Sequence, residues 1–211
     1  MGIRVPERVI TGFLSWFLPS SLHWKVETKE KTVFLTFDDG PIPELTGEIL
    51  EILYTYKARA TFFCVGENVM RNPGLFREIV RSGHAVGNHS HHHLKGWKTD
   101  IKRYIQDVEE ASRFIDSRLY RPPYGLISWR QARVLSRRYK VIMWSVLTRD
   151  YDQSVSPEQC LEIAVKGVEP GAIIVFHDNL KAREKVLYAL PRLLEYLKAE
   201  GYSCGVLSSE I

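Results

Sequence analysis

Two adjacent aspartates, Asp38 and Asp39, end an apolar run in the stretch TVFLTFDDGP. Neighbouring carboxylates repel each other, and burying even one of them is costly without a partner. Successive side chains of a strand point to opposite sides, so the two carboxylates can take different tasks. One could bind a cation, while the other acts as a base on a water molecule at that cation. Because Asp-Gly is also a frequent turn pair, the aspartates indicate chemistry only together with partners elsewhere in the chain.

A histidine-rich stretch, HSHHH at residues 89–93, offers ligands for such a cation. His89 and His93 are four residues apart, a spacing that brings two side chains to one side of a helical turn. His91 and His92 would then point elsewhere. An aspartate with two histidines is a common ligand set for a hydrolytic metal that keeps open coordination positions. A polar surface loop is the alternative for this stretch taken alone.

Further polar and titratable groups follow other strand-like segments. They are Arg121 in RPPYG, Asp150 in WSVLTRDYD, and His177 with Asp178 in IIVFHD. In an α/β barrel the carboxyl ends of the strands share one face, where such folds carry their chemistry. We therefore predict one composite site, in which the cation and Arg121 absorb the charge of the two aspartates. Asp178 is expected to cap the helix that follows it, and orientation of the loop after His177 is the alternative.

Strand-like and helix-like segments, which would position these residues, alternate from residue 31 onward. Strands are expected at 32–37, 60–65, 84–88, 118–120, 140–146, 172–176 and 203–208, where short β-branched and aromatic runs are bounded by Gly, Pro or charge. Helices are expected at 44–57, 73–82, 99–117, 128–138, 156–167 and 180–200. Short connections and the absence of a GxGxxG fingerprint after the first strand favour a single α/β barrel domain over a dinucleotide-binding sheet.

Composition and charge agree with one globular domain. The 211 residues are 45% apolar and 26% charged, and the net charge of +4 is spread along the chain, which gives no indication of nucleic-acid binding. Three widely spaced cysteines predict no disulfide framework.

The N-terminal segment, residues 1–30, is apolar from Val9 to Leu18. That stretch is too short to span a bilayer, and it lacks a clear small-residue cleavage site. Helical spacing of its apolar residues predicts a helix packed on the domain. A signal peptide or a membrane-surface segment is the alternative, so the localisation stays open between the cytoplasm and the cell envelope.

Five motifs in order along the chain resemble those of the polysaccharide deacetylases, the NodB-homology enzymes of carbohydrate esterase family 4. They are TFDDG, HSxxH, RPPYG, the stretch around Asp150 and a strand that ends in His177. The resemblance covers residues 31 to 208. It implies a distorted (β/α)7 barrel over residues 31–211 that holds a divalent metal. The metal would usually be zinc, with cobalt, nickel or manganese as alternatives.

The resemblance also implies roles for the residues that would carry out the reaction. Asp39, His89 and His93 match the metal triad. Asp38 matches the catalytic base, which deprotonates the water that attacks an N-acetyl carbonyl. His177 matches the general acid, which protonates the leaving amine.

Supporting roles follow from the same resemblance. Arg121 matches the arginine that holds the base, and Asp150 matches the aspartate that tunes the acid. The backbone N–H of Tyr124 would help to stabilise the oxyanion. Tyr151 and Val175 match apolar positions that hold the acetyl methyl group.

The fourth motif departs from the family pattern, since Leu147 stands where many members have Asp, and Tyr151 where they have Trp. These changes affect the expected substrate class more than the expected activity. The main expectation is a metal-dependent N-deacetylase acting on N-acetylglucosamine-containing glycans, chitooligosaccharide or peptidoglycan. An O-acetyl esterase on a polysaccharide such as xylan and a non-catalytic glycan-binding domain are the alternatives. An acetylated glycan is the expected partner, with no nucleic acid and no stable membrane span.

Overall fold

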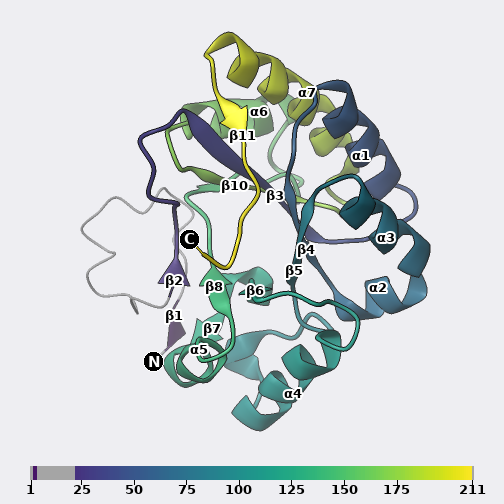
Figure 1. The fold of residues 1–211 in the computed structure, drawn as a ribbon, viewed down its shortest axis with the longest axis vertical. Helices are drawn as coiled ribbons and strands as arrows, with labels where there is room; N and C mark the ends of the chain where they lie inside the picture. Colours follow the sequence, from purple (N-terminus) through teal and green to yellow (C-terminus); the bar gives the residue numbers. More distant parts are fainter. Residues whose placement is uncertain (1, 4–21, 211) are drawn as a thin grey trace.

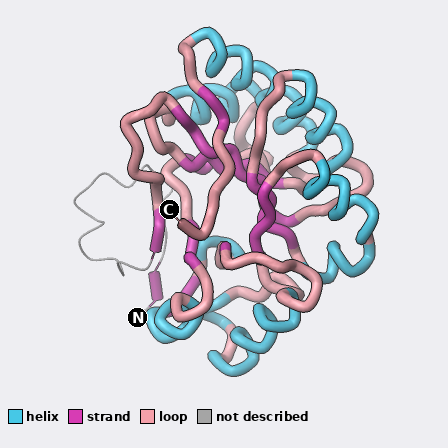
Figure 2. The backbone as a smooth tube through the Cα atoms, viewed as in Figure 1, coloured by secondary structure: helices cyan, strands magenta, loops and turns pink. Residues whose placement is uncertain are grey.

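The computed structural model describes residues 2–3 and 22–210 of the chain. Most of its strands form one curled parallel sheet, and helices surround the sheet on the outside (Figure 1, Figure 2). In spatial order these strands are β2 (Leu22–His23), β8 (Lys140–Ile142), β6 (Leu119–Tyr120), β5 (Ala85–Asn88), β4 (Thr61–Cys64), β3 (Thr32–Asp39), β10 (Ile173–His177) and β9 (Val146–Leu147), with β11 (Ser203–Cys204) paired to the start of β3. The observed strands overlap all seven expected segments.

An interrupted strand closes this sheet into a barrel-like ring. β8 pairs with β6 and β2, whereas β9, only three residues later, pairs with β10 at the other end of the sheet. Residues 140–146 were expected to form one strand, and the structure divides them because the two halves have different partners. The division leaves the carbonyl groups of Ile142 and Met143 facing the buried Arg121, as described below.

Six of the seven helices in the described part of the chain match expected segments. They are α1 (Thr46–Thr55), α3 (Pro73–Arg81), α4 (Ile101–Ala111), α5 (Trp129–Leu135), α6 (Pro157–Lys166) and α7 (Arg183–Ala199). Capping boxes begin α5 at Ser128 and α6 at Ser156. The additional helix, α2 (Gly66–Arg71), is too short for its apolar residues to show a helical period.

Strand alternation in β3 separates the two aspartates. Val33, Leu35 and Phe37 belong to the buried cluster that includes α1 and α7, whereas Phe34 belongs to a second cluster with β8 and β10. Asp38 lies four residues after Phe34, so its side chain points to the same side of the sheet as Phe34. Asp39, at the last position of β3, is free to turn away from it.

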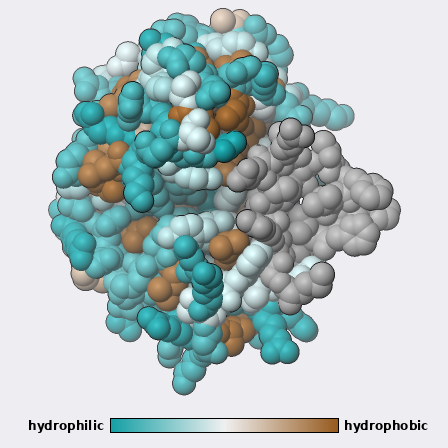
Figure 3. Space-filling view, turned by 180° about the vertical axis from the view of Figure 1, so that it is seen from behind, coloured by the Kyte–Doolittle hydropathy of each residue, from teal (hydrophilic) through white to brown (hydrophobic). Residues whose placement is uncertain are grey.

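The surface and the N-terminal segment complete the picture. The face drawn in Figure 3 is mostly hydrophilic, with apolar side chains in scattered groups. No helix among the described residues is long and apolar enough to cross a bilayer. β1 (Gly2–Ile3) pairs antiparallel with β7 (Ile127–Ser128), and the helix expected near residues 10–17 lies outside the described residues. All three cysteines are free, as expected.

Candidate active site

A cavity of about 670 Å³ opens where the carboxyl ends of the strands converge. Seven of the ten predicted site residues line it: Asp38, Asp39, His89, His93, Tyr124, Tyr151 and His177. Arg121 and Asp150 are fully buried; Arg121 makes hydrogen bonds to Asp38 and His89, and Asp150 makes hydrogen bonds to His177. Val175 is fully buried in the core cluster that contains Trp144. The predicted composite site is therefore one place in the fold, with Val175 behind its wall.

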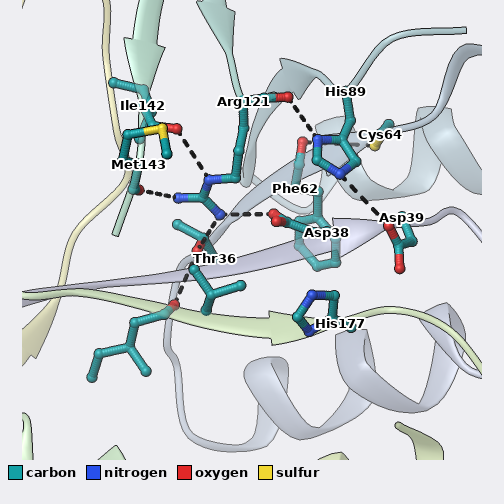
Figure 4. Close-up of polar contacts among 12 residues, drawn as sticks. Thr36, Asp38, Asp39, Phe62, Cys64, His89, Arg121, Ile142, Met143 and His177 are labelled. Atoms are coloured by element: carbon teal, nitrogen blue, oxygen red, sulfur yellow. Dashed lines mark hydrogen bonds and ion pairs between the residues drawn. The ribbon is translucent and has the colours of Figure 1, made fainter. Parts of the chain in front are cut away.

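The buried guanidinium of Arg121 holds Asp38 in place (Figure 4). It donates hydrogen bonds to Asp38 Oδ1 at 2.7 Å and to Thr36 Oγ1 at 2.8 Å. Its remaining donors reach the carbonyl oxygens of Ile142 at 3.3 Å and Met143 at 2.8 Å. Burial lowers the pKa of Arg121 against the opposing charge of Asp38, but a guanidinium remains protonated at neutral pH. The carboxylate of Asp38 thus has a fixed cationic partner inside the protein.

Asp39 turns away from Asp38 and toward two histidines. Its backbone has a φ of 84°, and its Oδ1 lies 3.1 Å from His93 Nε2 and 3.6 Å from His89 Nε2. Asn179 donates to its other oxygen at 2.6 Å. Burial alone would raise the pKa of Asp39, but contacts with His89 and His93 hold that pKa well below its usual value. The two aspartates therefore have different partners, as expected: Asp38 is bonded to Arg121, and Asp39 faces His89 and His93.

A loop, and not a helical turn, brings His89 and His93 together. Ser90 and His93 have φ values of 63° and 55°, in the left-handed region, and Asn88 Oδ1 accepts a hydrogen bond from the Ser90 amide at 2.8 Å. The prediction that His89 and His93 lie together is therefore confirmed, but a loop with left-handed residues, and not a helical turn, brings them together. His91 and His92 point away from the triad, as expected, toward α4.

The geometry of Asp39, His89 and His93 fits a divalent cation. One candidate ligand atom from each lies within 4.8 Å of the others. Ligand atoms about 2.0–2.2 Å from a tetrahedral zinc ion would lie about 3.4 Å from one another, close to the distances above. Nδ1 of His89 donates to the Arg121 carbonyl at 2.8 Å, which leaves Nε2 with the lone pair that faces Asp39. The donor set, its spacing and its outer hydrogen bond are those of a metal site.

His177 and Asp150 form a second polar pair at the end of β10. Asp150 accepts from His177 Nδ1 at 2.7 Å and from the His177 amide at 2.6 Å. Burial lowers the pKa of His177, but the charge and hydrogen bond of Asp150, assisted by Asp39 and Asp38, outweigh it and raise that pKa to about 9. The ring of Tyr151 meets the imidazole edge-on, with centroids 4.9 Å apart. The imidazole of His177 is therefore protonated at neutral pH.

Aromatic and apolar side chains complete the cavity wall. Tyr124 lies in a 3₁₀ turn, Pro123–Gly125, with a φ of 59°, and its ring centroid is 4.5 Å from that of His93. The Lys95 ammonium lies 4.7 Å from the Tyr124 ring centroid. Trp144, Leu147 and Leu180 also line the cavity. Leu147, at the position where the family pattern has an aspartate, makes this part of the wall apolar.

Two residues that make hydrogen bonds to the predicted site residues were not predicted from the sequence. Thr36 bonds Arg121, and Asn179 bonds Asp39. Thr36 has the same strand parity as Asp38, a signal that could have identified it. Asn179 lies two residues beyond His177, but nothing in the sequence shows that this loop turns back toward β3.

The expectation that Asp178 caps the next helix is wrong. Helix α7 begins at Arg183 with Ala182 at its N-cap. Asp178 is fully buried and accepts a hydrogen bond from Thr46 Oγ1, while its amide donates to the Asp38 carbonyl at 2.7 Å. Burial raises the pKa of Asp178 to about 7. The side chain of Asp178 is thus bonded to the start of α1, and its backbone amide is bonded to the end of β3.

Comparisons with known proteins agree with this geometry. The polysaccharide deacetylase family model matches residues 25–140. A peptidoglycan-N-acetylglucosamine deacetylase of Bacillus cereus is 32% identical over 200 residues, which cover 91% of this chain and 90% of the relative. A chitooligosaccharide deacetylase of a Bradyrhizobium species is 31% identical over 194 residues, covering 82% of this chain and 87% of the relative.

A solved structure supports the same assignment at the level of the fold. The crystal structure of a peptidoglycan N-acetylglucosamine deacetylase in complex with 4-naphthalen-1-yl-N-oxidanyl-benzamide superposes with a TM-score of 0.83 at 29% identity. The match covers 92% of this chain and 94% of that one, which confirms the predicted barrel-like fold and its single domain. By sequence and by fold, the chain belongs to the polysaccharide deacetylase family.

Proposed function

We propose that this protein hydrolyses the N-acetyl groups of N-acetylglucosamine-containing glycans, with peptidoglycan or chitooligosaccharide as the substrate class. The observation that carries the proposal is the presence of Asp38 and His177 in one cavity with the Asp39, His89 and His93 triad. An amide is a poor electrophile with a poor leaving group, so its hydrolysis needs an activated water, a polarised carbonyl and a proton for the amine. The names of the relatives support the glycan class.

The triad would hold a divalent cation, for which we propose zinc, with cobalt, nickel or manganese as alternatives. Two imidazoles and a carboxylate suit zinc and its transition-metal neighbours better than magnesium or calcium, which prefer oxygen ligands. When bound, the cation supplies Lewis-acid polarisation of the acetyl carbonyl and lowers the pKa of water.

Asp38 acts as the base, because its carboxylate faces the cavity while Arg121 fixes its orientation from behind. It accepts a proton from the attacking water. The backbone N–H of Tyr124 donates to the oxygen on which negative charge develops. The arginine keeps its bonds to Thr36 and to two backbone carbonyls, so the carboxylate does not have to reorient during the reaction.

His177 acts as the acid, because Asp150 keeps its imidazole protonated at neutral pH. It donates its Nε2 proton to the leaving amine as the carbon–nitrogen bond breaks, and acetate and a free amino sugar result. Tyr151, Leu147 and Trp144 form the apolar wall near this histidine, where we place the acetyl methyl group. Val175 supports that wall from the core and does not line the cavity.

Acetate release by the full chain tests the proposal. N-acetylchitooligosaccharides and peptidoglycan are offered to the protein as purified, after chelation, and after zinc is restored. We expect release that chelation abolishes and zinc restores. Asp38→Asn should retain the zinc content of the wild type and lose at least about 100-fold in kcat, because Asn keeps an acceptor for Arg121 but cannot take a proton.

The outcomes separate the alternatives. Loss of zinc by Asp38→Asn would show that the division of roles between the two aspartates is wrong. Intact zinc binding without release from either N-acetylated substrate would refute the N-deacetylase proposal and favour an O-acetylated polysaccharide such as xylan. A metal-bound protein that releases no acetate from any of these substrates would be a binding domain.

A further inference from the structure

Two of the histidines that the proposed reaction does not use, His91 and His92, belong to a second group of potential ligands. His91 and His92 lie between the two triad histidines in sequence, but their side chains face α4. Together with Glu110 of α4 they offer one candidate ligand atom each, all within 4.8 Å of one another. We propose that His91, His92 and Glu110 form a second metal site, which takes zinc or a neighbouring late transition metal and is separate from the catalytic triad.

Asp107, one helical turn before Glu110, fixes the loop and the tautomer of His92. Its Oδ2 accepts the amides of His91 at 3.0 Å and His92 at 3.1 Å, and its Oδ1 lies 2.6 Å from His92 Nδ1. A carboxylate can only accept here, so the His92 proton resides on Nδ1 and the lone pair on Nε2. A carboxylate that orients a histidine through its second nitrogen is the usual outer partner of a metal-ligating imidazole.

His91 lacks the hydrogen bonds that its burial calls for. The residue is only 3% exposed, and its Nδ1 has no hydrogen-bond partner within the described part of the chain. That nitrogen packs against Gly66, where a Cβ atom would lie 2.5 Å from it, and the ring stacks on Phe114 at 5.7 Å between centroids. The imidazole is therefore held in one place, and Nε2 is the ring nitrogen that faces Glu110.

Nε2 of His91 lies 3.7 Å from Glu110 Oε1, too far for a hydrogen bond. It is close to the separation of about 3.4 Å that two ligands of one tetrahedral zinc ion have. A cation between these atoms would satisfy both, with His92 as the third ligand and water as the fourth. The side chains of His92 and Glu110 are 51% and 44% exposed, so the metal can enter from solvent.

A metal ion in this site would connect the loop at residues 89–93 to α4 through His91, His92 and Glu110, in addition to the hydrogen bonds that Asp107 already makes. The same loop carries His89 and His93, so the second metal would stiffen the backbone that positions two ligands of the first. Zinc would then stabilise the folded protein by binding it in preference to the unfolded chain, in proportion to the logarithm of its free concentration.

Zinc stoichiometry of the full chain tests the inference. The protein is equilibrated with buffered free zinc, and bound metal per chain is measured by elemental analysis. We expect two zinc ions in the wild type and one in His92→Ala and in Glu110→Gln. Glu109→Gln, an exposed neighbour on α4 with the same change of charge, should still bind two. His93→Ala should lose the catalytic ion and keep the other.

Cobalt provides a second readout. Visible d–d absorption of the cobalt-substituted protein should lose one component in Glu110→Gln, without a change in the component that His93→Ala removes. One zinc per wild-type chain, or two in either His92→Ala or Glu110→Gln, would overturn the assignment. A loss in Glu109→Gln would also overturn it, because charge and not ligation would then be responsible. Two ions bound without any acetate release would refute the proposed function alone.

Discussion

The pairing of Asp150 with His177 makes a quantitative prediction for Asp150→Asn. Asp150 is fully buried and accepts two hydrogen bonds from His177, one from the ring and one from the amide. The two bonds end on different oxygens of Asp150, and an asparagine places a donor NH2 group at one of those positions, so it cannot accept both bonds in this geometry. It also has no charge to stabilise the imidazolium. Burial then acts against the protonated ring, with only the charges of Asp38 and Asp39 opposing it.

The size of the effect follows from the raised pKa. A rise from 6.5 to about 9 corresponds to about 3 kcal/mol in favour of the protonated ring in the folded protein. At pH 8 a group with a pKa of about 9 is about 90% protonated, and one with a pKa of 6.5 about 3%, so the supply of acid falls about 30-fold. The contribution of protonated His177 to the free energy of unfolding is fully present below pH 6.5 and is lost as the pH rises through about 9.

Two measurements check this prediction. NMR titration of the metal-free protein should give a His177 pKa of about 9 in the wild type, and one near or below 6.5 in Asp150→Asn. The alkaline limb of kcat/KM should move to lower pH in the variant, while Asp116→Asn, an exposed matched substitution, leaves both values in place. An unchanged His177 pKa in Asp150→Asn would refute the electrostatic reasoning, whatever happens to the rate.

Two further predictions concern stability and are measured by urea unfolding of the metal-free protein. Arg121→Ala should cost about 3–5 kcal/mol, because it leaves the buried carboxylate of Asp38 unpaired. Arg183→Ala, which breaks an exposed ion pair, should cost no more than about 1 kcal/mol, and equal losses would contradict the argument. Gly171→Ala should cost at least about 2 kcal/mol, since φ is 82° and a Cβ would lie 1.9 Å from a backbone oxygen. Gly47→Ala, with open space around it in α1, should be neutral or stabilising, and a similar loss in both would count against the prediction.

Much of the fold could be predicted because the sheet is buried on both faces. Its strands are short apolar runs that end at turn residues, and the helices between them have caps or glycine stops that the sequence displays. The division of residues 140–147 into two strands could not be predicted, because it depends on which strands meet when the sheet closes. The pairing of β2 with β8 could not be predicted either, because a strand of two residues shows no periodic pattern in the sequence.

The site was predictable to the extent that it lies at strand ends. Asp38, Asp39 and His177 terminate neighbouring strands, so their convergence follows from the topology. The backbone of the His89–His93 loop was not predictable, because its left-handed residues are not glycine or asparagine. Asn179 was missed because the path of a loop is decided by tertiary contacts, here its bond to Asp39.

Because the chain is interrupted between β8 and β9, the arginine that holds Asp38 is bonded to main-chain oxygens, and these bonds do not depend on the side chains at residues 142 and 143. Arg121 is held at this break by the carbonyl oxygens of Ile142 and Met143, and main-chain oxygens persist whatever side chains those positions carry. A library that varies residues 142 and 143 among apolar side chains of similar volume should therefore reshape the barrel interior without removing an acceptor from the arginine. Thr36 is the one side chain in that set of acceptors, apart from Asp38, that such a library would have to leave unchanged.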